Sequence, residues 1–503
     1  MKYTFFLLLI YVFSNSVAFA QLDKGFANNG VYIGDTNGYF LRVAIQPDQK
    51  IVLTGWRYIS NLQNSITIRL NADGSLDQNF ANNGEFRYPL QNNIGSAGFN
   101  GLCFQPDNKI ILGGITEVIP TNLDFLICRL KSDGSPDSSF GNTGYVTTAY
   151  THPLGVGIAE KLSSIALQQD GKILAYGSYK FSLDTLQVLR YHTNGKIDSS
   201  FAVSGRFRTS TGFSFPMTND IAVLPDGRIM LGASTRITTI NRHCFTAIRL
   251  LSNGDLDTSF NHTGVAYAEV GNALVYCKAM QVQPDGKILL VGHADSLIVV
   301  RFDTNGVLDA NFGKSGIVKI SKSTGNSLAM QPNGKIIVAG ELDSSLIIYR
   351  LMPNGTIDFS FGINGSVAHK VLTRRNIPYG LAHQQDDKLL VCGASSDFNA
   401  GFDAKCVVLR FTPNATNISP TEKNIDFNVY PNPASDEIII DNKTHKTIRQ
   451  LSLFTTDSKL IFKHTLPNTN RLNTGNLSNG MYILNVQFLD YSTATRKLII
   501  QKK

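Results

Sequence analysis

Short runs of apolar residues, each followed by turn-forming residues, recur along most of the chain. In "AIQPDQKIVLTG" (residues 44–55), one apolar run ends at Gln-Pro, a turn follows, and a second apolar run begins after Lys50. The pattern returns as "CFQPDNKIILGG", "ALQQDGKILAYG", "AVLPDGRIMLGA", "QVQPDGKILLVG", "AMQPNGKIIVAG" and "AHQQDDKLLVCG". Short apolar runs bounded by turn residues are typical of β-strands. The sequence therefore predicts seven copies of one β-hairpin.

Two further elements accompany each hairpin. An Arg followed by an apolar or aromatic residue ends another run, at Arg69, Arg129, Arg190, Arg249, Arg301, Arg350 and Arg410. An Asp-x-x-Phe element occurs at Asp23/Phe26, Asp77/Phe80, Asp137/Phe140, Asp198/Phe201, Asp257/Phe260, Asp309/Phe312 and Asp358/Phe361. The first Asp-x-x-Phe element has no Arg-bearing run before it, and the last Arg-bearing run has no such element after it. The ends of the array are therefore complementary.

This offset predicts how the repeat array closes. Each unit holds four strand-like runs in about 56 residues, as in a propeller blade. The N-terminal run at residues 30–34 would then be the outer strand of the last blade, and the ring would have no open strand edges. An open solenoid is the alternative, but it would need distinct capping repeats. We expect an all-β fold, a seven-bladed β-propeller closed by an N-terminal outer strand.

The repeats resemble a known family. The elements "QPDGKIL…G" and "RL…DGSLDxxF" are similar to the delta-60 repeat, a bacterial repeat of β-propeller type, over roughly residues 22–412. The resemblance implies architecture, because the family as a whole shares no reaction or ligand.

The composition changes after Phe411. The stretch "TPNATNISPTEKNID" is polar and has two prolines, so we expect a linker at residues 413–426. Short alternating apolar runs at 427–503 predict a small Ig-like β-sandwich. Its stretch Tyr430 to Pro433, the stretch Leu477 to Tyr482 and its basic end resemble the type A C-terminal sorting domain of type IX secretion. An ordinary Ig-like binding module is the alternative.

The N-terminus is typical of an export signal. Lys2 is followed by an apolar run from Phe5 to Phe13 and by the small-x-small sequence Ala18-Phe19-Ala20. We expect a signal peptide at residues 1–20 and a propeller at 21–412; an uncleaved membrane anchor is the alternative, although the run is shorter than the roughly 20 residues a spanning helix needs. The sorting resemblance implies recognition by the type IX machinery, so the protein is expected to be secreted or held at the outer-membrane surface.

The net charge and the cysteine positions constrain the function only weakly. The net charge of +8 is spread thinly, so we expect no nucleic-acid partner. No segment after the N-terminal run is apolar enough to span a bilayer, so we expect no transmembrane segment, and we expect a monomer. Cys103 and Cys128 stand where other copies have apolar residues, which predicts core thiols. Cys392 and Cys406 fall on neighbouring strands, which leaves a disulfide open, and two further cysteines, Cys244 and Cys277, are undecided.

The strand order predicts where a ligand would bind. The Gln-Pro turns and the Asp-x-x-Phe elements share one face, called lower here, whereas the loops that vary in length lie on the opposite, upper face. Variable loops on a rigid scaffold are common binding sites. Aromatic and polar residues in these loops are the candidate ligand contacts: Trp56, Arg57, Tyr58, Arg242, His243, His293, Asp295 and Tyr379. The alternative is that they pack between blades or are merely solvated.

Catalytic and metal-binding motifs are not found, so no catalytic residue, metal or cofactor is assigned. The expected function is binding of a glycan, peptide or surface partner. A carbohydrate-active hydrolase or lyase is an alternative because carboxylates occur in the upper loops, at Glu117, Asp124, Glu160, Asp184, Asp397 and Asp403. A purely structural surface component is a further alternative.

The stretch "NADGSLDQNF" (71–80) resembles a calcium loop, but the position of Asn71 lacks a consistent oxygen donor in the other copies. We instead expect a structural role: Asp77 accepts backbone N–H bonds from the turn or pairs with the preceding Arg, while Phe80 packs under the blade.

Overall fold

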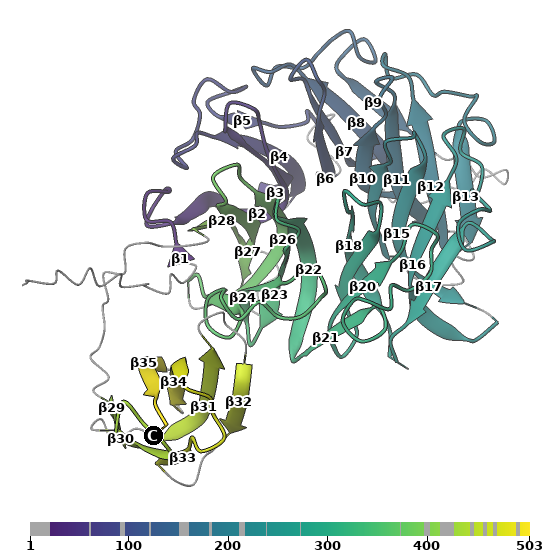
Figure 1. Cartoon of the computed structure of the whole chain (residues 1–503). Helices are drawn as coiled ribbons and strands as arrows, with labels where there is room; N and C mark the ends of the chain where they lie inside the picture. Colours follow the sequence, from purple (N-terminus) through teal and green to yellow (C-terminus); the bar gives the residue numbers. More distant parts are fainter. Residues whose placement is uncertain are drawn as a thin grey trace, which may run out of the picture. The chain divides into compact units, whose positions relative to one another are not determined.

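The computed structural model describes most of the chain. The described residues are 21–59, 62–90, 96–119, 122–149, 160–180, 184–210, 217–237, 239–271, 273–372, 374–396, 403–412, 427–442, 447–455, 460–465, 470–488 and 493–502. Every regular element among them is a β-strand (Figure 1). They form two compact units, Ala20–Asp358 with Gly365–Pro413, and Asn414–Lys503 with Phe359–Asn364. The expected signal peptide and linker lie outside the described residues.

The first unit is an all-β propeller-like array of antiparallel sheets. Five sheets have four strands each, paired in chain order. Their strands are β6 (Ala97–Phe104), β7 (Ile110–Ile119), β8 (Asn122–Leu130), β9 (Tyr145–Thr148); β10 (Glu160–Leu167), β11 (Ile173–Lys180), β12 (Asp184–Tyr191), β13 (Arg206–Ser210); β14 (Met217–Val223), β15 (Ile229–Ile237), β16 (Arg242–Leu250), β17 (Val265–Glu269); β18 (Tyr276–Val282), β19 (Ile288–His293), β20 (Ser296–Phe302), β21 (Ile317–Ser321); β22 (Ser323–Met330), β23 (Ile336–Leu342), β24 (Ser345–Leu351) and β25 (Ser366–His369).

An eight-stranded sheet contains both ends of this unit. Its long strand β2 (Val31–Ile45) is shared, because residues 31–33 pair with β28 (Lys405–Thr412) and residues 38–45 pair with β3 (Ile51–Ile59). The short strand β1 (Gln21–Leu22) also pairs with β28. The other strands of this sheet are β4 (Leu62–Leu70), β5 (Glu85–Phe86), β26 (Arg375–His383) and β27 (Leu389–Ser396).

One strand of each repeat faces its equivalents in the neighbouring repeats. Along the chain, β2, β6, β10, β14, β18, β22 and β26 each contact the next, and β26 also contacts β2. We call these the inner strands. The strands that pair with them are apolar almost throughout, as expected for strands covered on both faces; in β19, for example, Ile288 to Val291 are at most 1% exposed.

The lower ends of the sheets carry one repeated network of charged and aromatic side chains. Arg69 Nε donates to Asp77 Oδ2 over 2.7 Å, and Asp77 Oδ1 accepts the backbone N–H of Asn79. The Arg69 guanidinium lies 4.6 Å from the centre of the Phe80 ring, which is fully buried. Both contacts expected for Asp77 are therefore confirmed.

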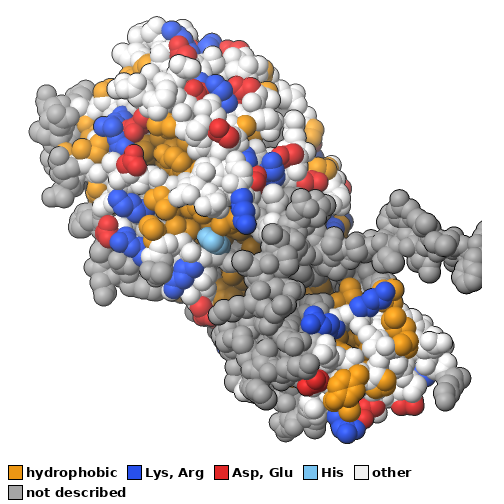
Figure 2. All heavy atoms as spheres, turned by 90° about the vertical axis from the view of Figure 1, so that its left-hand side faces the viewer, with side chains coloured by type: hydrophobic (Ala, Val, Ile, Leu, Met, Phe, Trp, Pro, Cys, Tyr) orange, Lys and Arg blue, Asp and Glu red, His pale blue; other side chains and the backbone are white. Residues whose placement is uncertain are grey.

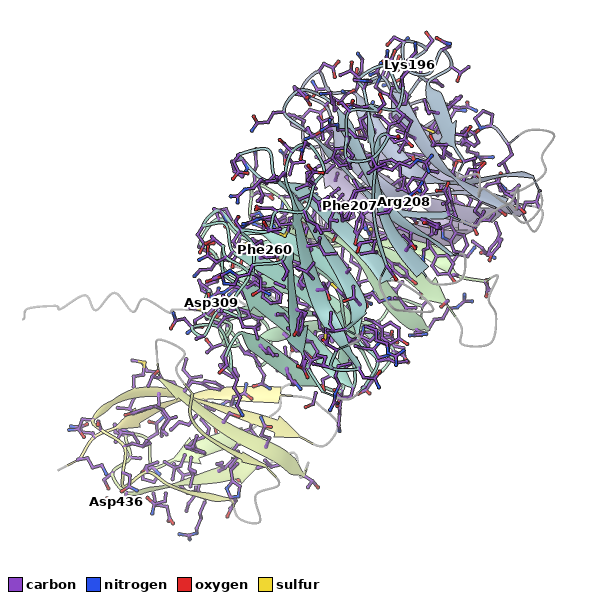
Figure 3. The ribbon with its side chains drawn as sticks, turned by 90° about the vertical axis from the view of Figure 1, so that its right-hand side faces the viewer. Lys196, Phe207, Arg208, Phe260, Asp309 and Asp436 are labelled. Atoms are coloured by element: carbon purple, nitrogen blue, oxygen red, sulfur yellow. The ribbon has the colours of Figure 1, made fainter. Side chains whose placement is uncertain are left out.

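The Arg–Asp pair of this network recurs in every repeat. The Arg–Asp distances are 2.7 to 3.0 Å for Arg69–Asp77, Arg129–Asp137, Arg190–Asp198, Arg249–Asp257, Arg301–Asp309, Arg350–Asp358 and Arg410–Asp23. Figure 3 labels Phe260 and Asp309, which belong to two such networks. The last pair joins Arg410 near the end of the array to Asp23 near its start.

The network also ties each sheet to the following one. Arg69 Nη1 donates to the carbonyl of Ser132, which lies in the turn of the next repeat. Gly134 of that turn has a φ of +87°, and a Cβ there would fall 2.6 Å from the Phe80 ring. The Asn/Asp-Gly turn thus needs glycine both for its backbone and for contact with the preceding repeat.

The buried aspartates of this network are held in the charged form. Burial alone would raise the pKa of Asp137, but hydrogen bonds from Ser139 and the charges of Arg129 and Lys109 outweigh it and lower the pKa to about 2. The same balance lowers the pKa of Asp198 and of Asp257 to about 2. Each carboxylate therefore stabilises the fold at neutral pH.

The second unit has two antiparallel sheets around one core. Its core side chains include Ile438, Leu453, Leu484 and Leu498, all at most 1% exposed. The strands are β29 (Phe427–Tyr430), β30 (Glu437–Asn442) and β33 (Arg471–Asn473) in one sheet, and β32 (Leu460–Thr465), β31 (Ile448–Thr455), β34 (Gly480–Phe488) and β35 (Thr493–Ile500) in the other. Two facing sheets with a shared core form a small sandwich.

The six cysteines form no disulfide. Cys392 lies opposite Val408, and Cys406 lies opposite Ala394, so the two thiols are not at directly paired positions. Burial raises the pKa of Cys392 to about 12, which keeps it a protonated core thiol. A Cys392–Cys406 bridge is therefore not formed.

Candidate binding site

Every inner strand is interrupted by a β-bulge at the same place. The pairing with the next strand skips a residue between Phe40 and Arg42 in β2, and the other inner strands have equivalent shifts. The skipped residues are Leu41, Asn100, Ser163, Asn219 with Asp220, Lys278, Asn326 and Tyr379. Bulges redirect a side chain and are frequent next to functional sites.

A glycine opposite the bulge makes room for it. A Cβ at Gly340 of β23 would lie 1.7 Å from the carbonyl oxygen of Thr324, just before the bulge in β22. Gly55, Gly114, Gly177, Gly292 and Gly393 have the same relation to their inner strands. The exception is Ala233 of β15, and there the pairing skips two residues of β14 against Gly232. In the other six repeats, the glycine that ends the "KIL…G" run is thus required by the bulge.

The bulged side chains meet in one cavity of about 510 Å³. Six of them line it: Leu41, Asn100, Ser163, Lys278, Asn326 and Tyr379. The rest of the lining consists of Arg42, Lys161, His293, Thr324, Glu341, Arg375 and Ile377. These residues come from the inner strands and from the upper ends of β19 and β23, so the cavity lies at the upper side of the inner strands.

Arg42 reaches from β2 to two distant repeats. Its Nη2 donates to the carbonyl of Ser163 at 3.3 Å and to Asp220 Oδ1 at 3.2 Å. Asp220 Oδ2 in turn accepts the backbone N–H of Met280 at 3.0 Å. These contacts join β2, β10, β14 and β18 beside the bulges, so Arg42 forms the floor of the cavity.

Basic side chains predominate in the cavity wall. Glu341 is the single carboxylate among the lining residues, and its two oxygens accept from Arg375 Nε and Nη2 at 2.6 and 2.8 Å. Burial lowers the pKa of Lys278, and the positive charge of Lys161 lowers it further. Burial and Lys278 also lower the pKa of His293, so at neutral pH this imidazole is neutral.

An aromatic cluster adjoins the cavity. Tyr379 meets Tyr39 edge to face with 6.1 Å between ring centres, and Tyr39 lies 4.3 Å from Trp56. Trp56 in turn contacts Tyr58 at 5.2 Å. A Cβ at Gly98 of β6 would lie 3.3 Å from Trp56 Cβ, so Trp56 packs between two sheets. Burial raises the pKa of Tyr379 to about 12, which leaves its hydroxyl protonated.

The remaining predicted contacts lie elsewhere. Arg57 is 5% exposed; it donates to Thr36 at 3.1 Å and pairs with Glu85 of β5. Arg242 and His243 begin β16, and Asp295 is exposed in the turn between β19 and β20. Of the eight predicted residues, only His293 and Tyr379 line the cavity.

Sequence reasoning missed most of the cavity, although a signal was present. The bulged residue stands five positions before the first residue of each hairpin turn, which is Gln in six copies and Leu224 in one, as Lys278 stands before Gln283. At this position the copies read Leu, Asn, Ser, Asn, Lys, Asn and Tyr, whereas the position two residues later is apolar in every copy: Val43, Leu102, Ile165, Ile221, Met280, Leu328 and Leu381. A variable, mostly polar position at a fixed distance before a constant apolar one is the sequence signal of this site.

The upper-loop carboxylates do not line the cavity. Glu160 is 1% exposed and accepts a hydrogen bond from Gln187 at 2.6 Å, and burial raises its pKa to about 7. Asp124 is buried near it, and Asp403 pairs with Arg374 at 3.0 Å. Glu117 is also absent from the lining. Asp397 and the side chain of Asp184 lie outside the described residues.

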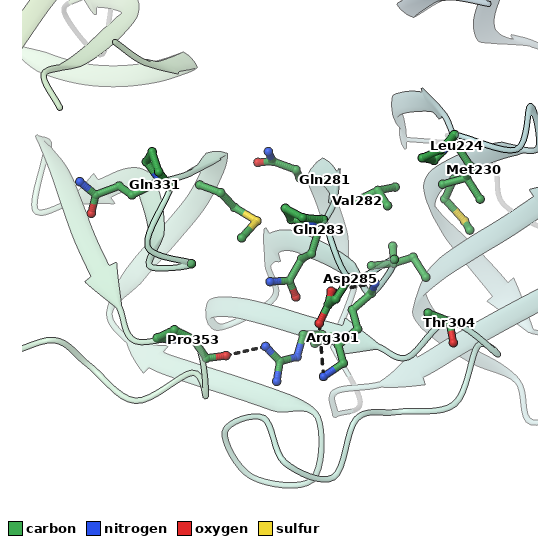
Figure 4. Close-up of a pocket in the computed structure, with 18 of the residues that line it drawn as sticks. Leu224, Met230, Gln281, Val282, Gln283, Asp285, Arg301, Thr304, Gln331 and Pro353 are labelled. Carbon is green, nitrogen blue, oxygen red and sulfur yellow. Dashed lines mark hydrogen bonds and ion pairs between the residues drawn. The ribbon is translucent and has the colours of Figure 1, made fainter. Parts of the chain in front are cut away.

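A second cavity, of about 1130 Å³, lies among the lower turns of three consecutive sheets (Figure 4). Its charged side chains already have partners within the lower network: Arg301 donates to the carbonyl of Pro353, and Lys287 pairs with Asp285.

The described residues offer no competing charged site on the face shown in Figure 2, where basic and acidic side chains are interspersed rather than gathered into one patch. The upper cavity is therefore the best candidate site.

The fold and the repeated lower network define a β-propeller repeat protein. Six segments match the family described as domain of unknown function (DUF5122) beta-propeller, the delta-60-type repeat: residues 46–80, 105–140, 168–201, 224–260, 283–312 and 331–361. Residues 428–501 match the secretion system C-terminal sorting domain. The chain thus carries delta-60-type propeller repeats and a C-terminal sorting domain.

The family model matches six of the seven copies, and the seventh copy differs because its elements lie at opposite ends of the array. Its hairpin and Arg410 lie near the end of the array, but its Asp-x-x-Phe element, Asp23 to Phe26, lies at the start.

The sorting domain implies export by type IX secretion to the cell surface or beyond. In the described part of the chain, no helix has the length and apolarity that crossing a bilayer requires.

Several solved structures are similar to this chain at low identity and with TM-scores below 0.5. A catalytically inactive virginiamycin B lyase from Staphylococcus aureus with quinupristin has a TM-score of 0.44 at 10% identity, covering 75% of this chain and 98% of that one. Polysaccharide lyase Uly1 gives 0.43 at 12%, covering 78% and 92%. The β-propeller domain of the Trilobed protease from Pyrococcus furiosus gives 0.39 at 11%, covering 76% and 100%. No relative is found among curated proteins.

Proposed function

We propose that this protein is a secreted or surface-attached binding module, a closed seven-bladed propeller that holds its ligand in the upper cavity. The expected boundaries are a signal peptide at 1–20, the propeller at 21–412, a linker at 413–426 and the sorting domain at 427–503. The pairing of β1 and β2 with β28, and the contact of β26 with β2, support closure by the N-terminal strand.

One observation carries the binding role: six inner strands from separate repeats each place a bulged residue in the lining of the same cavity. The interruption of a strand ladder costs hydrogen bonds, so its recurrence in every repeat supports a use for the redirected side chains. The lining mixes amide, hydroxyl, charged and aromatic groups, as ligand pockets of this size do. A catalytic carboxylate pair is not available among the lining residues, because Glu341 is alone and bound by Arg375.

A binding screen with a blocked cavity tests the proposal. The mature chain is screened against glycan and peptide arrays beside Asn326→Trp, which fills the cavity, and Asp295→Asn, which changes an exposed upper turn outside it. We expect Asn326→Trp to lose every ligand that the wild type and Asp295→Asn bind. Binding that survives in a folded Asn326→Trp protein places the site elsewhere, and a blank screen favours a purely structural role.

A further inference from the structure

The wall of the upper cavity has an excess of positive charge. Four cationic side chains line it, Arg42, Lys161, Lys278 and Arg375, against one carboxylate, Glu341. Glu341 is bound by Arg375, and Asp220 binds Arg42. The other two cationic side chains of the lining are Lys161 and Lys278. A concave wall of one charge sign concentrates the field and attracts ions of the opposite sign.

The two lysines act on the same space although they come from different repeats. Lys161 lies on β10 and Lys278 is the bulged residue of β18; both line the cavity, and the positive charge of Lys161 adds to burial in lowering the pKa of Lys278. The ammonium group of Lys278 lies 5.6 Å from the centre of the Tyr276 ring. An anion held between the two lysines would relieve their repulsion and accept hydrogen bonds from both.

The rest of the lining suits a sugar. Asn100, Ser163, Thr324 and Asn326 offer amide and hydroxyl groups that both donate and accept, as sugar hydroxyls require. Tyr379 and Ile377 add apolar surface for the carbon face of a sugar ring. A volume of about 510 Å³ falls within the usual range of small-ligand pockets, roughly 300 to 1,000 Å³.

We propose that the cavity binds an acidic sugar unit of a glycan, with the carboxylate or sulfate of that unit placed between Lys161 and Lys278. This inference rests on the proposed function and adds the ligand class. A peptide with acidic side chains is a weaker fit because the four neutral polar side chains of the lining would not be matched by repeated hydroxyls.

Pairs of glycan probes that differ only in their charged group test whether binding depends on the charge of the ligand. Binding to the mature chain is measured by calorimetry for oligogalacturonate and its methyl ester, for sulfated and unsulfated dextran oligosaccharides, and for poly-glutamate. The variants are Lys161→Gln and Lys278→Gln, and the control is Lys196→Gln, an exposed lysine in a lower turn (Figure 3). Thermal unfolding verifies that each variant folds; since Lys161 is exposed, Lys161→Gln decides the outcome if Lys278→Gln is unstable.

We expect at least one charged glycan to bind about tenfold or more tightly than its uncharged partner, since hydrogen bonds to charged groups have that effect. Lys161→Gln and Lys278→Gln should each abolish most of this preference, whereas Lys196→Gln keeps it. The pair that shows the preference identifies the anion as carboxylate or sulfate.

Equal binding of charged and uncharged partners overturns the acidic-sugar proposal and leaves binding in the cavity intact. Poly-glutamate binding as tight as the charged glycans contradicts the glycan class. A preference unchanged in Lys161→Gln places the anion outside the cavity. Absence of binding to all five probes also overturns this proposal, and the proposed function is then judged separately by the Asn326→Trp screen.

Discussion

Replacing Asp137 by Asn tests whether the lower network stabilises the propeller. Asp137 is 5% exposed and bound by Arg129 at 2.8 Å, and its pKa falls from 3.8 to about 2 on folding. A shift of about 1.8 units corresponds to roughly 2.5 kcal/mol at neutral pH. The substitution also leaves the buried Arg129 without a carboxylate, so we expect Asp137→Asn to lower the free energy of unfolding by about 2 to 4 kcal/mol.

The assay is urea unfolding of the mature chain, followed by the fluorescence of Trp56, the single tryptophan. The control is Asp107→Asn in the neighbouring turn, whose side chain is 54% exposed and pairs with Lys109 at 2.9 Å; it should cost less than about 1 kcal/mol. A loss in Asp137→Asn no larger than in Asp107→Asn would refute the reasoning.

The contribution of Asp137 to the free energy of unfolding should decrease as the pH falls. The folded-state pKa of Asp137 lies below the unfolded value, so its contribution is fully present above about pH 4 and is lost as the pH falls toward 2. The difference between wild type and Asp137→Asn should therefore shrink to about half at pH 3. A difference that stays constant between pH 7 and pH 3 contradicts this origin.

Three other changes have expected outcomes. Gly340→Ala should lower the free energy of unfolding by more than about 2 kcal/mol, because its Cβ would clash with the carbonyl of Thr324, whereas Gly25→Ala, which has space, should cost little in the same urea assay. Deletion of residues 21–34 from the mature chain should expose the edge of β28 and cause self-association in light scattering, and a monomer as stable as wild type argues against closure by the N-terminal strand. Deletion of residues 427–503 should leave the protein in the periplasm of a type IX-secreting host, and surface delivery in cell fractionation contradicts the sorting role.

The fold could be predicted because its determinants are local and repeated. The Gln-Pro turns, Asp77 and Phe80 recur with their equivalents in register, and each recurrence strengthens the assignment of the others. The offset of Asp23 from Arg410 even indicated which chain segments meet. What the pattern did not indicate was the irregularity within each inner strand, since a bulge shifts the pairing by one residue while the apolar residue two positions later, such as Val43, keeps its fixed distance from the turn.

The site was only partly predictable for the same reason. His293 and Tyr379 of the cavity lining were among the predicted contacts because they stand beside variable loops, but Lys161, Lys278 and Asn326 lie inside strands, where side chains are usually assigned to packing. Arg57 looked like a ligand contact because it sits between two aromatics, yet alternation along β3 turns it toward Glu85. Convergence of residues from separate repeats follows from the arrangement of the sheets, which no single repeat encodes.

The bulges have a consequence for how such a protein can diversify. Because six inner strands each turn one side chain toward the cavity while the turns, glycines and Arg–Asp pairs hold the scaffold, a single codon in each of these repeats can change recognition without repacking a core. The positions of Leu41, Asn100, Ser163, Lys278, Asn326 and Tyr379 thus resemble the randomised positions of a binder library. New specificities could be selected by varying these codons alone, on a framework that is otherwise left unchanged.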